Sequence, residues 1–215
     1  MKNNTIIKEH VLKEIKKYLE ELKIINYESK IEKIFEHLNI LEKWNKAFNI
    51  TSILNFDSAI KKHFLDSISI INYIKKNNIV DIGTGGGFPG IPLSIFLPEK
   101  KFTLVEINCK RINFLIYVKK ELNLRNLEIK KVRAEKYNGK KFDHVIMRAV
   151  CPDSKIYFLC KNFMHEKSDV LLMKGKLIDI NQYKKIPFNF TIHELNVPEK
   201  NAKRQLVILK NKLCI

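Results

Sequence analysis

The chain has 215 residues, 45% of them hydrophobic and 29% charged, and it carries a formal net charge of +17. This length and apolar share suit one globular domain with a small addition, and no run of 18 apolar residues offers a transmembrane helix. The first residues lack the apolar block of a signal peptide, and the four cysteines form no C-x-x-C pair, which favours free thiols over a zinc site. We therefore expect a cytoplasmic protein that contacts no membrane and holds no metal.

Helical spacing of apolar residues dominates the first third of the chain. Apolar residues recur every three or four positions over residues 7–22 and again over residues 31–41. A third helix fits residues 59–73, with Asp57 or Ser58 as its N-cap. These patterns predict a small helical subdomain over residues 1–77.

Short apolar runs alternate with helical ones from residue 79 onward. Strands are expected near residues 79–82, 102–106, 127–132, 142–147, 169–173, 189–195 and 205–210, and helices near 91–97, 109–122, 153–162 and 176–183. This alternation predicts an α/β fold over residues 78–215, with a seven-stranded, mostly parallel sheet that is covered by helices. The last two strands have no obvious helix between them.

A glycine-rich loop follows the first of these strands. It reads Asp81-Ile82-Gly83-Thr84-Gly85-Gly86-Gly87-Phe88-Pro89-Gly90. Glycine lets the backbone turn tightly and lets a ligand approach main-chain atoms, and the helix behind the loop presents free N–H groups. The loop therefore predicts a nucleotide-type cofactor site.

Two cofactors fit the spacing of this loop. Counted from Gly85 it fits the dinucleotide pattern G-x-G-x-x-G, and counted from Gly83 it resembles motif I of the class I S-adenosylmethionine (AdoMet) methyltransferases. Asp81 suits the ammonium group of AdoMet and would repel a pyrophosphate. Glu106 ends the next strand and can accept hydrogen bonds from ribose hydroxyls, which does not separate NAD from AdoMet. We expect Asp81, Gly85 and Glu106 to contact the cofactor.

Five segments carry a more specific resemblance. Residues 43–51, 62–67, 81–93, 110–115 and 142–149 read KWNKAFNIT, KHFLDS, DIGTGGGFPGIPL, KRINFL and FDHVIMRA. In these segments the chain resembles, over almost its whole length, the bacterial small-subunit (16S) ribosomal RNA guanine-N7 methyltransferase family, also called glucose-inhibited division protein B. The resemblance implies a Rossmann-like class I methyltransferase fold with an antiparallel last strand. It also implies AdoMet as cofactor and 16S ribosomal RNA or the small ribosomal subunit as partner, and we expect a monomer.

The resemblance also implies the roles of individual residues. Gly83 and Phe88 match loop residues that line the AdoMet pocket, and Ala134 and Glu135 match a pair that contacts the adenine. Arg148 matches a binding arginine beside both the cofactor and the target base, which makes it the candidate catalytic residue.

The chemistry of guanine N7 agrees with the residues present. N7 carries an in-plane lone pair and no hydrogen, so the reaction needs alignment rather than a general base. The chain accordingly shows no obvious acid/base pair. Arg148 can place its planar cation beside the O6/N7 edge of guanine. Because that cation opposes the charge forming on the methylated base, we expect Arg148 to orient the base rather than to stabilise charge.

Most of the excess of Lys and Arg lies in residues 81–215, which suits a polyanion, although a lysine-rich composition also fits an AT-rich genome. Lys174 and Arg204 are candidate RNA contacts, with a solvated charge as the alternative for each. Trp44 is expected to pack in the core rather than to stack on a base. His63 and Asp66, one helical turn apart, are expected to join the helical part to the sheet.

Three functions remain open from the sequence. The favoured one is a ribosomal RNA guanine-N7 methyltransferase. The second is a class I methyltransferase that acts on tRNA or protein, and the third is a non-catalytic RNA-binding module that retains AdoMet. The presence of Asp81, Glu106 and Glu135 together speaks against the third.

Overall fold

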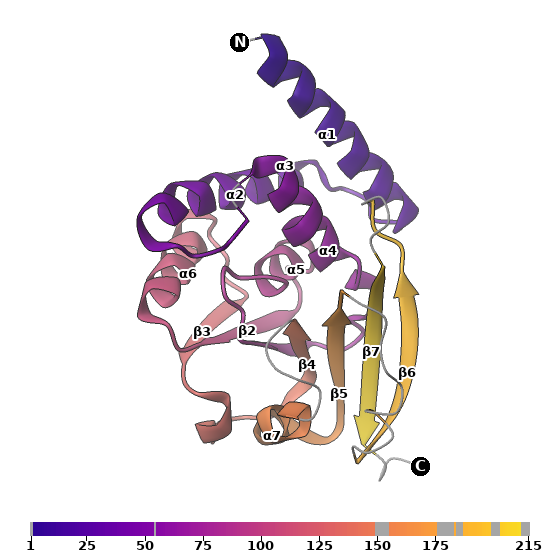
Figure 1. Cartoon of the computed structure of the whole chain (residues 1–215). Coiled ribbons are helices and arrows are strands. Elements are labelled where there is room, and N and C mark those ends of the chain that lie inside the picture. The colour runs from indigo at the N-terminus through magenta and orange to yellow at the C-terminus, as the bar shows by residue number, and fades with distance from the viewer. Residues whose placement is uncertain are drawn as a thin grey trace.

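A computed structural model shows helices gathered over one part of a long twisted sheet (Figure 1), and it describes residues 2–53, 55–148, 155–175, 183, 187–198 and 203–211. The N-terminal part consists of α1 (Lys2–Glu21), α2 (Glu28–Phe48), α3 (Phe56–Ala59), the π-helical segment η1 (Ile60–Leu65), α4 (Asp66–Ile68) and the 3₁₀ turn η2 (Ile71–Tyr73). No helix in these ranges is both long and apolar enough to cross a membrane.

The sheet has seven strands in the order β3-β2-β1-β4-β5-β7-β6. They are β1 (Asn78–Ile82), β2 (Lys101–Glu106), β3 (Leu127–Lys131), β4 (Phe142–Arg148), β5 (Met164–Lys174), β6 (Phe188–Leu195) and β7 (Arg204–Asn211). The first five strands run parallel, and β7 runs antiparallel between β5 and β6. The predicted seven-stranded, mostly parallel sheet with an antiparallel last strand is confirmed.

Short helices connect the parallel strands. They are α5 (Gly90–Phe96), α6 (Cys109–Glu121), the 3₁₀ turn η3 (Ala134–Lys136), α7 (Ile156–Cys160) and the 3₁₀ turn η5 (Lys161–Phe163). Asn108 caps α6, because its Oδ1 accepts from the backbone N–H groups of Lys110 and Arg111 at 3.0 and 3.2 Å. Of the helix predicted over residues 176–183, only Tyr183 lies within the described residues.

Three sequence predictions need correction. The N-cap of the third helical run is Asn55, not Asp57 or Ser58, since the Asn55 side chain accepts from the backbone N–H of Ser58 at 3.2 Å. That run also ends at Ile68 rather than at residue 73. The fifth strand begins at Met164, five residues before the predicted start. Its first half is only partly buried and shows no apolar run, so the sequence pattern did not reveal it.

The centre of the sheet, formed by β1, β2 and β4, is buried on both faces. One core joins the N-terminal helices, α5 and α6 to inward residues of the strands, such as Ile79, Leu104 and Ile146. The other face holds Val80 and Val145 and packs against α7 and η5. Burial on both faces explains why the parallel strands read as apolar runs. The predicted division at residues 77 and 78 therefore falls within a shared core, and it stays a prediction.

Candidate active site

Two cavities open at the carboxyl ends of the parallel strands, where ligands bind in open α/β sheets. The main cavity, of about 740 Å³, lies between the glycine loop, residues 50–53 and the ends of β4 and β5. The side cavity, of about 350 Å³, lies between the ends of β1 and β2 and the turn after β3. Gly83 lines both cavities, so the glycine loop stands where they meet.

The glycine loop has the backbone that its sequence predicts. Gly85 has a φ of +60° with no atom within 4 Å of an added Cβ, so its backbone conformation, rather than space, requires glycine there. Gly90 is required for space, because a Cβ there would lie 2.2 Å from Leu104 Cδ2 and 2.9 Å from Asp81 Oδ2. Gly90 thus lets α5 lie directly against β1 and β2.

Asp81 holds this loop in place through hydrogen bonds. Its Oδ2 accepts from Thr84 Oγ1 at 2.6 Å and from the Gly90 backbone N–H at 2.9 Å. Oδ1 is buried and has no hydrogen-bond partner within the described residues. Burial raises the pKa of the Asp81 carboxyl to about 6, against the effect of these two hydrogen bonds. Asp81 is buried beneath the loop and lines neither cavity, so its contact with the cofactor stays a prediction.

Glu106 ties the end of β2 to the loop. Its Oε1 accepts from the backbone N–H groups of Ile107 and Asn108, and its Oε2 accepts from that of Gly85 at 3.1 Å. Arg111 Nη1 lies 3.5 Å from Oε2. Arg111 was not among the site residues predicted from the sequence, although its place in the first turn of the helix after this strand indicates a residue near the cofactor. Glu106 lines the side cavity and Arg111 the main cavity.

The turn after β3 forms the opposite wall of the side cavity. Ala134 and Glu135 lie on η3 and line this cavity, and their contact with the adenine stays a prediction. Asn162 Nδ2 donates to the backbone oxygen of Glu135 at 2.9 Å and so fixes the turn against η5. The side cavity therefore brings together a carboxylate, glycine backbone and an ordered turn.

Arg148 reaches from the end of β4 into the main cavity. Its Nη1 donates to the Lys62 backbone oxygen at 3.1 Å and to Asp66 Oδ2 at 3.0 Å, and its Nη2 donates to His63 Nδ1 at 3.2 Å. Its guanidinium carbon lies 5.7 Å from the centre of the Phe88 ring. Three of its five N–H hydrogens are used in this way, and no described residue uses the Nε hydrogen or the second Nη2 hydrogen.

Asp66 joins Arg148 to Arg204 at the start of β7, on the same edge of the sheet. Its Oδ1 accepts from Arg204 Nε at 2.9 Å while its Oδ2 accepts from Arg148. Lys174 also lines this cavity, at the end of β5. The expected bridge between the helical part and the sheet is therefore present, but His63 and Asp66 meet through Arg148 rather than each other.

His63 is held neutral beside this arginine. Burial, together with the Arg148 cation, lowers the pKa of His63 to about 3. Arg148 donates to Nδ1, so Nε2 carries the ring hydrogen and donates to Thr51 Oγ1 at 2.9 Å. The ring stacks on Phe88 with centroids 4.3 Å apart. His63 is therefore fully engaged and is not placed to act as a general base.

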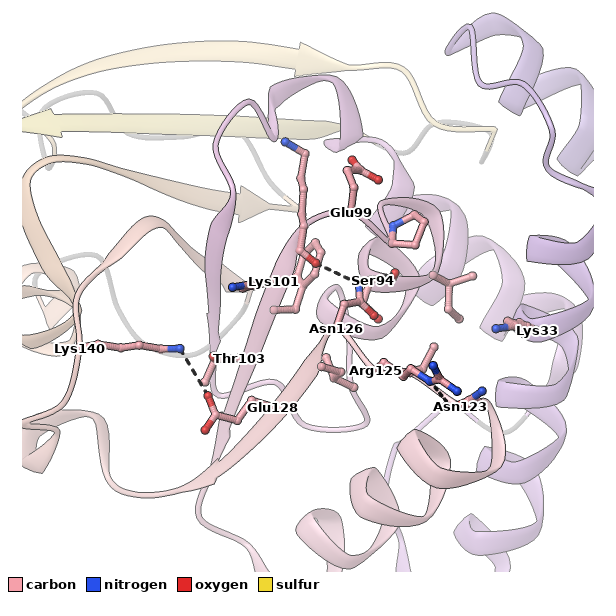
Figure 2. Close-up of a pocket in the computed structure, with 16 residues that line it drawn as sticks. Lys33, Ser94, Glu99, Lys101, Thr103, Asn123, Arg125, Asn126, Glu128 and Lys140 are labelled. Atoms are coloured by element: carbon pink, nitrogen blue, oxygen red, sulfur yellow. Dashed lines mark hydrogen bonds and ion pairs between the residues drawn. The ribbon is translucent and has the colours of Figure 1, made fainter.

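A third cavity, of about 580 Å³, lies at the opposite end of the strands (Figure 2). Asn126 stands at its centre and donates to the backbone oxygens of Ser94 and Lys100, both at 3.0 Å. No predicted site residue lines this cavity. His165 Nε2 lies 3.1 Å from Asp143 Oδ1, and no three side chains that could hold a metal ion gather among the described residues.

Comparisons with known proteins identify the family of the chain. A family model described as rRNA small subunit methyltransferase G matches residues 30–208. A protein of Francisella tularensis subsp. holarctica (strain FTNF002-00 / FTA), named ribosomal RNA small subunit methyltransferase G, is 40% identical over 93% of this chain and 97% of its own length. A protein of the same name from Francisella philomiragia subsp. philomiragia is 40% identical over 92% of this chain and 97% of its own length.

Solved structures show the same fold at low sequence identity. Magnesium protoporphyrin IX methyltransferase from Synechocystis PCC 6803, solved with bound SAH, has a TM-score of 0.57 and 14% identity, covering 81% of this chain and 100% of that one. Precorrin-6y C5,15-methyltransferase from Geobacter metallireducens GS-15 has a TM-score of 0.54 and 13% identity, covering 68% of this chain and 87% of that one. The fold is therefore that of the class I AdoMet-dependent methyltransferases.

Proposed function

The chain belongs to the rRNA small subunit methyltransferase G family, and we propose that it uses AdoMet to methylate N7 of a guanine in 16S ribosomal RNA. It is thus an AdoMet-dependent methyltransferase of ribosomal RNA, and the position on the base is the finer part of the proposal. The observation that supports this part is the setting of Arg148: His63 and Asp66 beside it are both engaged in hydrogen bonds, so the described residues there leave no general base.

The residues present fit AdoMet. When bound, AdoMet supplies an electrophilic methyl group on a positively charged sulfur. Glu106 can accept from the ribose hydroxyls, the turn at Ala134 and Glu135 can contact the adenine, and Asp81 Oδ1 is a buried acceptor without a partner within the described residues. The open backbone at Gly85 lets a ligand approach the main chain. NAD fits less well, because the Asp81 carboxylate lies beneath the loop that would hold its pyrophosphate.

Arg148 can orient the guanine through the two hydrogens that remain on its guanidinium. The N7 lone pair must stay free to react, so we assign these donors to O6 and not to the O6/N7 pair that the sequence analysis considered. The partners Asp66, His63 and Lys62 hold the guanidinium in one orientation before RNA arrives. Such fixed positioning lowers the barrier of a reaction that needs no proton transfer.

The substrate side of the main cavity is basic. Lys174 and Arg204 line it, and we propose that they contact RNA phosphates. Arg204 Nε donates to Asp66 Oδ1 at 2.9 Å, which holds this side chain at the edge of the cavity. A monomer in the cytoplasm is the form that we propose for the active protein, and light scattering of the purified protein tests the monomer.

The decisive experiment measures transfer of a labelled methyl group from AdoMet. The substrates are naked 16S ribosomal RNA and small subunits, both from a strain that lacks this enzyme, with tRNA and total protein as comparisons. We expect label in the ribosomal RNA and, after nuclease digestion, in 7-methylguanosine. Label in tRNA or protein alone would favour the second hypothesis, and AdoMet binding without any transfer would favour the non-catalytic one.

A further inference from the structure

Three aromatic side chains gather on the outer side of α2 and α6, which pack against each other in Figure 1. The Trp44 ring lies 5.3 Å from Phe48 and 5.6 Å from Tyr117, measured between ring centroids. Phe48 and Tyr117 are each 41% exposed, and Trp44 is half-buried. We call Trp44, Phe48 and Tyr117 the aromatic patch.

The patch is held in place from beneath. Phe114 is fully buried under it and meets the Trp44 ring edge-on at 5.8 Å. Trp44 and Phe48 lie four residues apart on α2, which places them on one face of that helix. Trp44 therefore packs on the core, as expected, while its neighbours present their rings to solvent. Exposed rings with fixed positions can bind a flat partner at little cost in side-chain entropy.

Aromatic contacts connect the patch to the candidate active site. His37 stacks on Phe114 at 6.0 Å and on Phe88 of the glycine loop at 4.9 Å. The chain also runs directly from Phe48 into residues 50–53, which line the main cavity. The N-terminal turn of α6 adds Arg111 to the same cavity. A strand of RNA that enters the main cavity can therefore continue across the patch.

The charges around the patch favour a polyanion. Lys110 and Lys120 are exposed on α6, seven residues before and three residues after Tyr117, and so share its side of the helix. Lys43 is exposed next to Trp44. Of the acidic residues nearby, Glu42 on α2 is paired with Lys46 at 3.6 Å, and Glu121 is exposed four residues after Tyr117, so the three lysines outnumber it. Phosphates are thus attracted while the rings face solvent.

We propose that the aromatic patch stacks unpaired bases of the RNA segment next to the target guanine. Stacking on aromatic rings suits single-stranded RNA, because every base has a flat face and an A-form duplex hides it. The inference rests on the proposed function in one respect, which is that RNA is the partner. It adds that the substrate is single-stranded at and beside the guanine.

The test uses Trp44, the only tryptophan of the chain, as its own probe. The full-length protein is titrated with a single-stranded RNA of about ten nucleotides, a length within the range of known single-strand sites. An abasic strand of equal length and charge, and a duplex of the same sequence, serve as comparisons. We expect the single strand to quench Trp44 fluorescence and to bind more tightly than either comparison.

Variants then locate the contact. Phe48→Ala and Tyr117→Ala should each weaken binding of the single strand about 5- to 150-fold, the range expected for one lost stacking contact. Tyr117→Phe keeps the ring and should bind as the parent protein does. Phe158→Ala is the matched control, since Phe158 is 51% exposed on α7, away from the patch. Stabilisation of each variant by AdoMet against heat shows that it is folded.

Two outcomes would overturn the inference: equal affinity for the abasic strand, or unchanged affinity of both alanine variants. A patch that instead mediates self-association would be revealed by light scattering, with dimers lost in the same variants. Failure of the proposed function looks different, because then no methyl group is transferred to ribosomal RNA although single-stranded RNA still quenches Trp44.

Discussion

Asp66 positions two arginines of the candidate active site. One buried carboxylate binds Arg148 through one oxygen and Arg204 through the other, at 3.0 and 2.9 Å. The sequence predicted all three residues as functional or bridging. It could not predict that they meet, because Arg148 lies 82 positions and Arg204 138 positions away from Asp66. Such pairing depends on the order of the strands, which local patterns do not contain.

Asp66→Asn should separate the positioning of Arg148 from RNA attraction. We expect single-turnover methyl transfer to fall, because both arginines lose their counter-charge, while RNA binding is kept or strengthened. Unfolding by urea should show a loss of about 1–3 kcal/mol, less than for a fully buried pair because the arginines are partly exposed. Asp57→Asn, which removes an exposed partner of Lys61, is the control. Unchanged transfer in Asp66→Asn would contradict the positioning role.

Arg148→Lys tests whether the guanidinium orients the base. Lysine keeps the charge but cannot hold Asp66, His63 and the Lys62 backbone in one plane while donating to O6. Losing this contact is worth about 1–3 kcal/mol, so single-turnover transfer at saturating AdoMet should fall about 5- to 150-fold. RNA affinity should stay within a few fold, since it comes mostly from dispersed phosphate contacts. Transfer at the parental rate would make Arg148 a structural residue.

At the scale of elements, the spacing of apolar residues was sufficient to predict the strands of the sheet and most of the helices. The central strands β1, β2 and β4 are buried on both faces, which gives short apolar runs, such as the one in β2 that ends at Glu106. The start of β5 was missed because its first residues are half exposed. The cap at Asn55 was missed because Asn, Asp and Ser are all good N-caps and stand close together there.

We expect contrasting effects from substitutions of two glycines in the glycine loop. Gly90→Ala should destabilise the protein by about 1–3 kcal/mol, because its Cβ would overlap Leu104 and Asp81, where α5 meets the sheet. It should also weaken the binding of AdoMet, because the loop would lose its hydrogen bond to Asp81. Gly86→Ala is the matched control, since its Cβ would make only ordinary contacts at 3.5 Å or more. Urea unfolding and AdoMet calorimetry measure both effects, and equal stability of the two variants would contradict this account.

At the scale of the whole molecule, buried histidines make stability depend on pH. Burial lowers the pKa of His37 and of His144 to about 4, and that of His63 to about 3. His37 lies on α2, His144 on β4 and His63 on η1, so protonation would act on both the helical part and the sheet. Asp81 acts in the opposite direction, because its pKa is raised to about 6 and the native state then holds a proton that the unfolded chain releases.

The sign of the pH effect follows from these shifts. Between about pH 6.5 and pH 4 the unfolded chain binds protons on histidine that the native state refuses, so the free energy of unfolding falls as the solution is acidified. Asp81 contributes stability below about pH 4 that is lost as the pH rises through 6, which offsets one histidine of the three.

We therefore expect a net loss of a few kcal/mol from about pH 7 to pH 4.5, measured by urea unfolding at constant ionic strength. His37→Phe keeps an aromatic ring between Phe88 and Phe114 and removes one of the three groups, so its stability should fall less steeply over that window. A slope in His37→Phe as steep as in the parent protein would show that His37 is not buried in neutral form, and the aromatic contacts assigned to it would then need another basis.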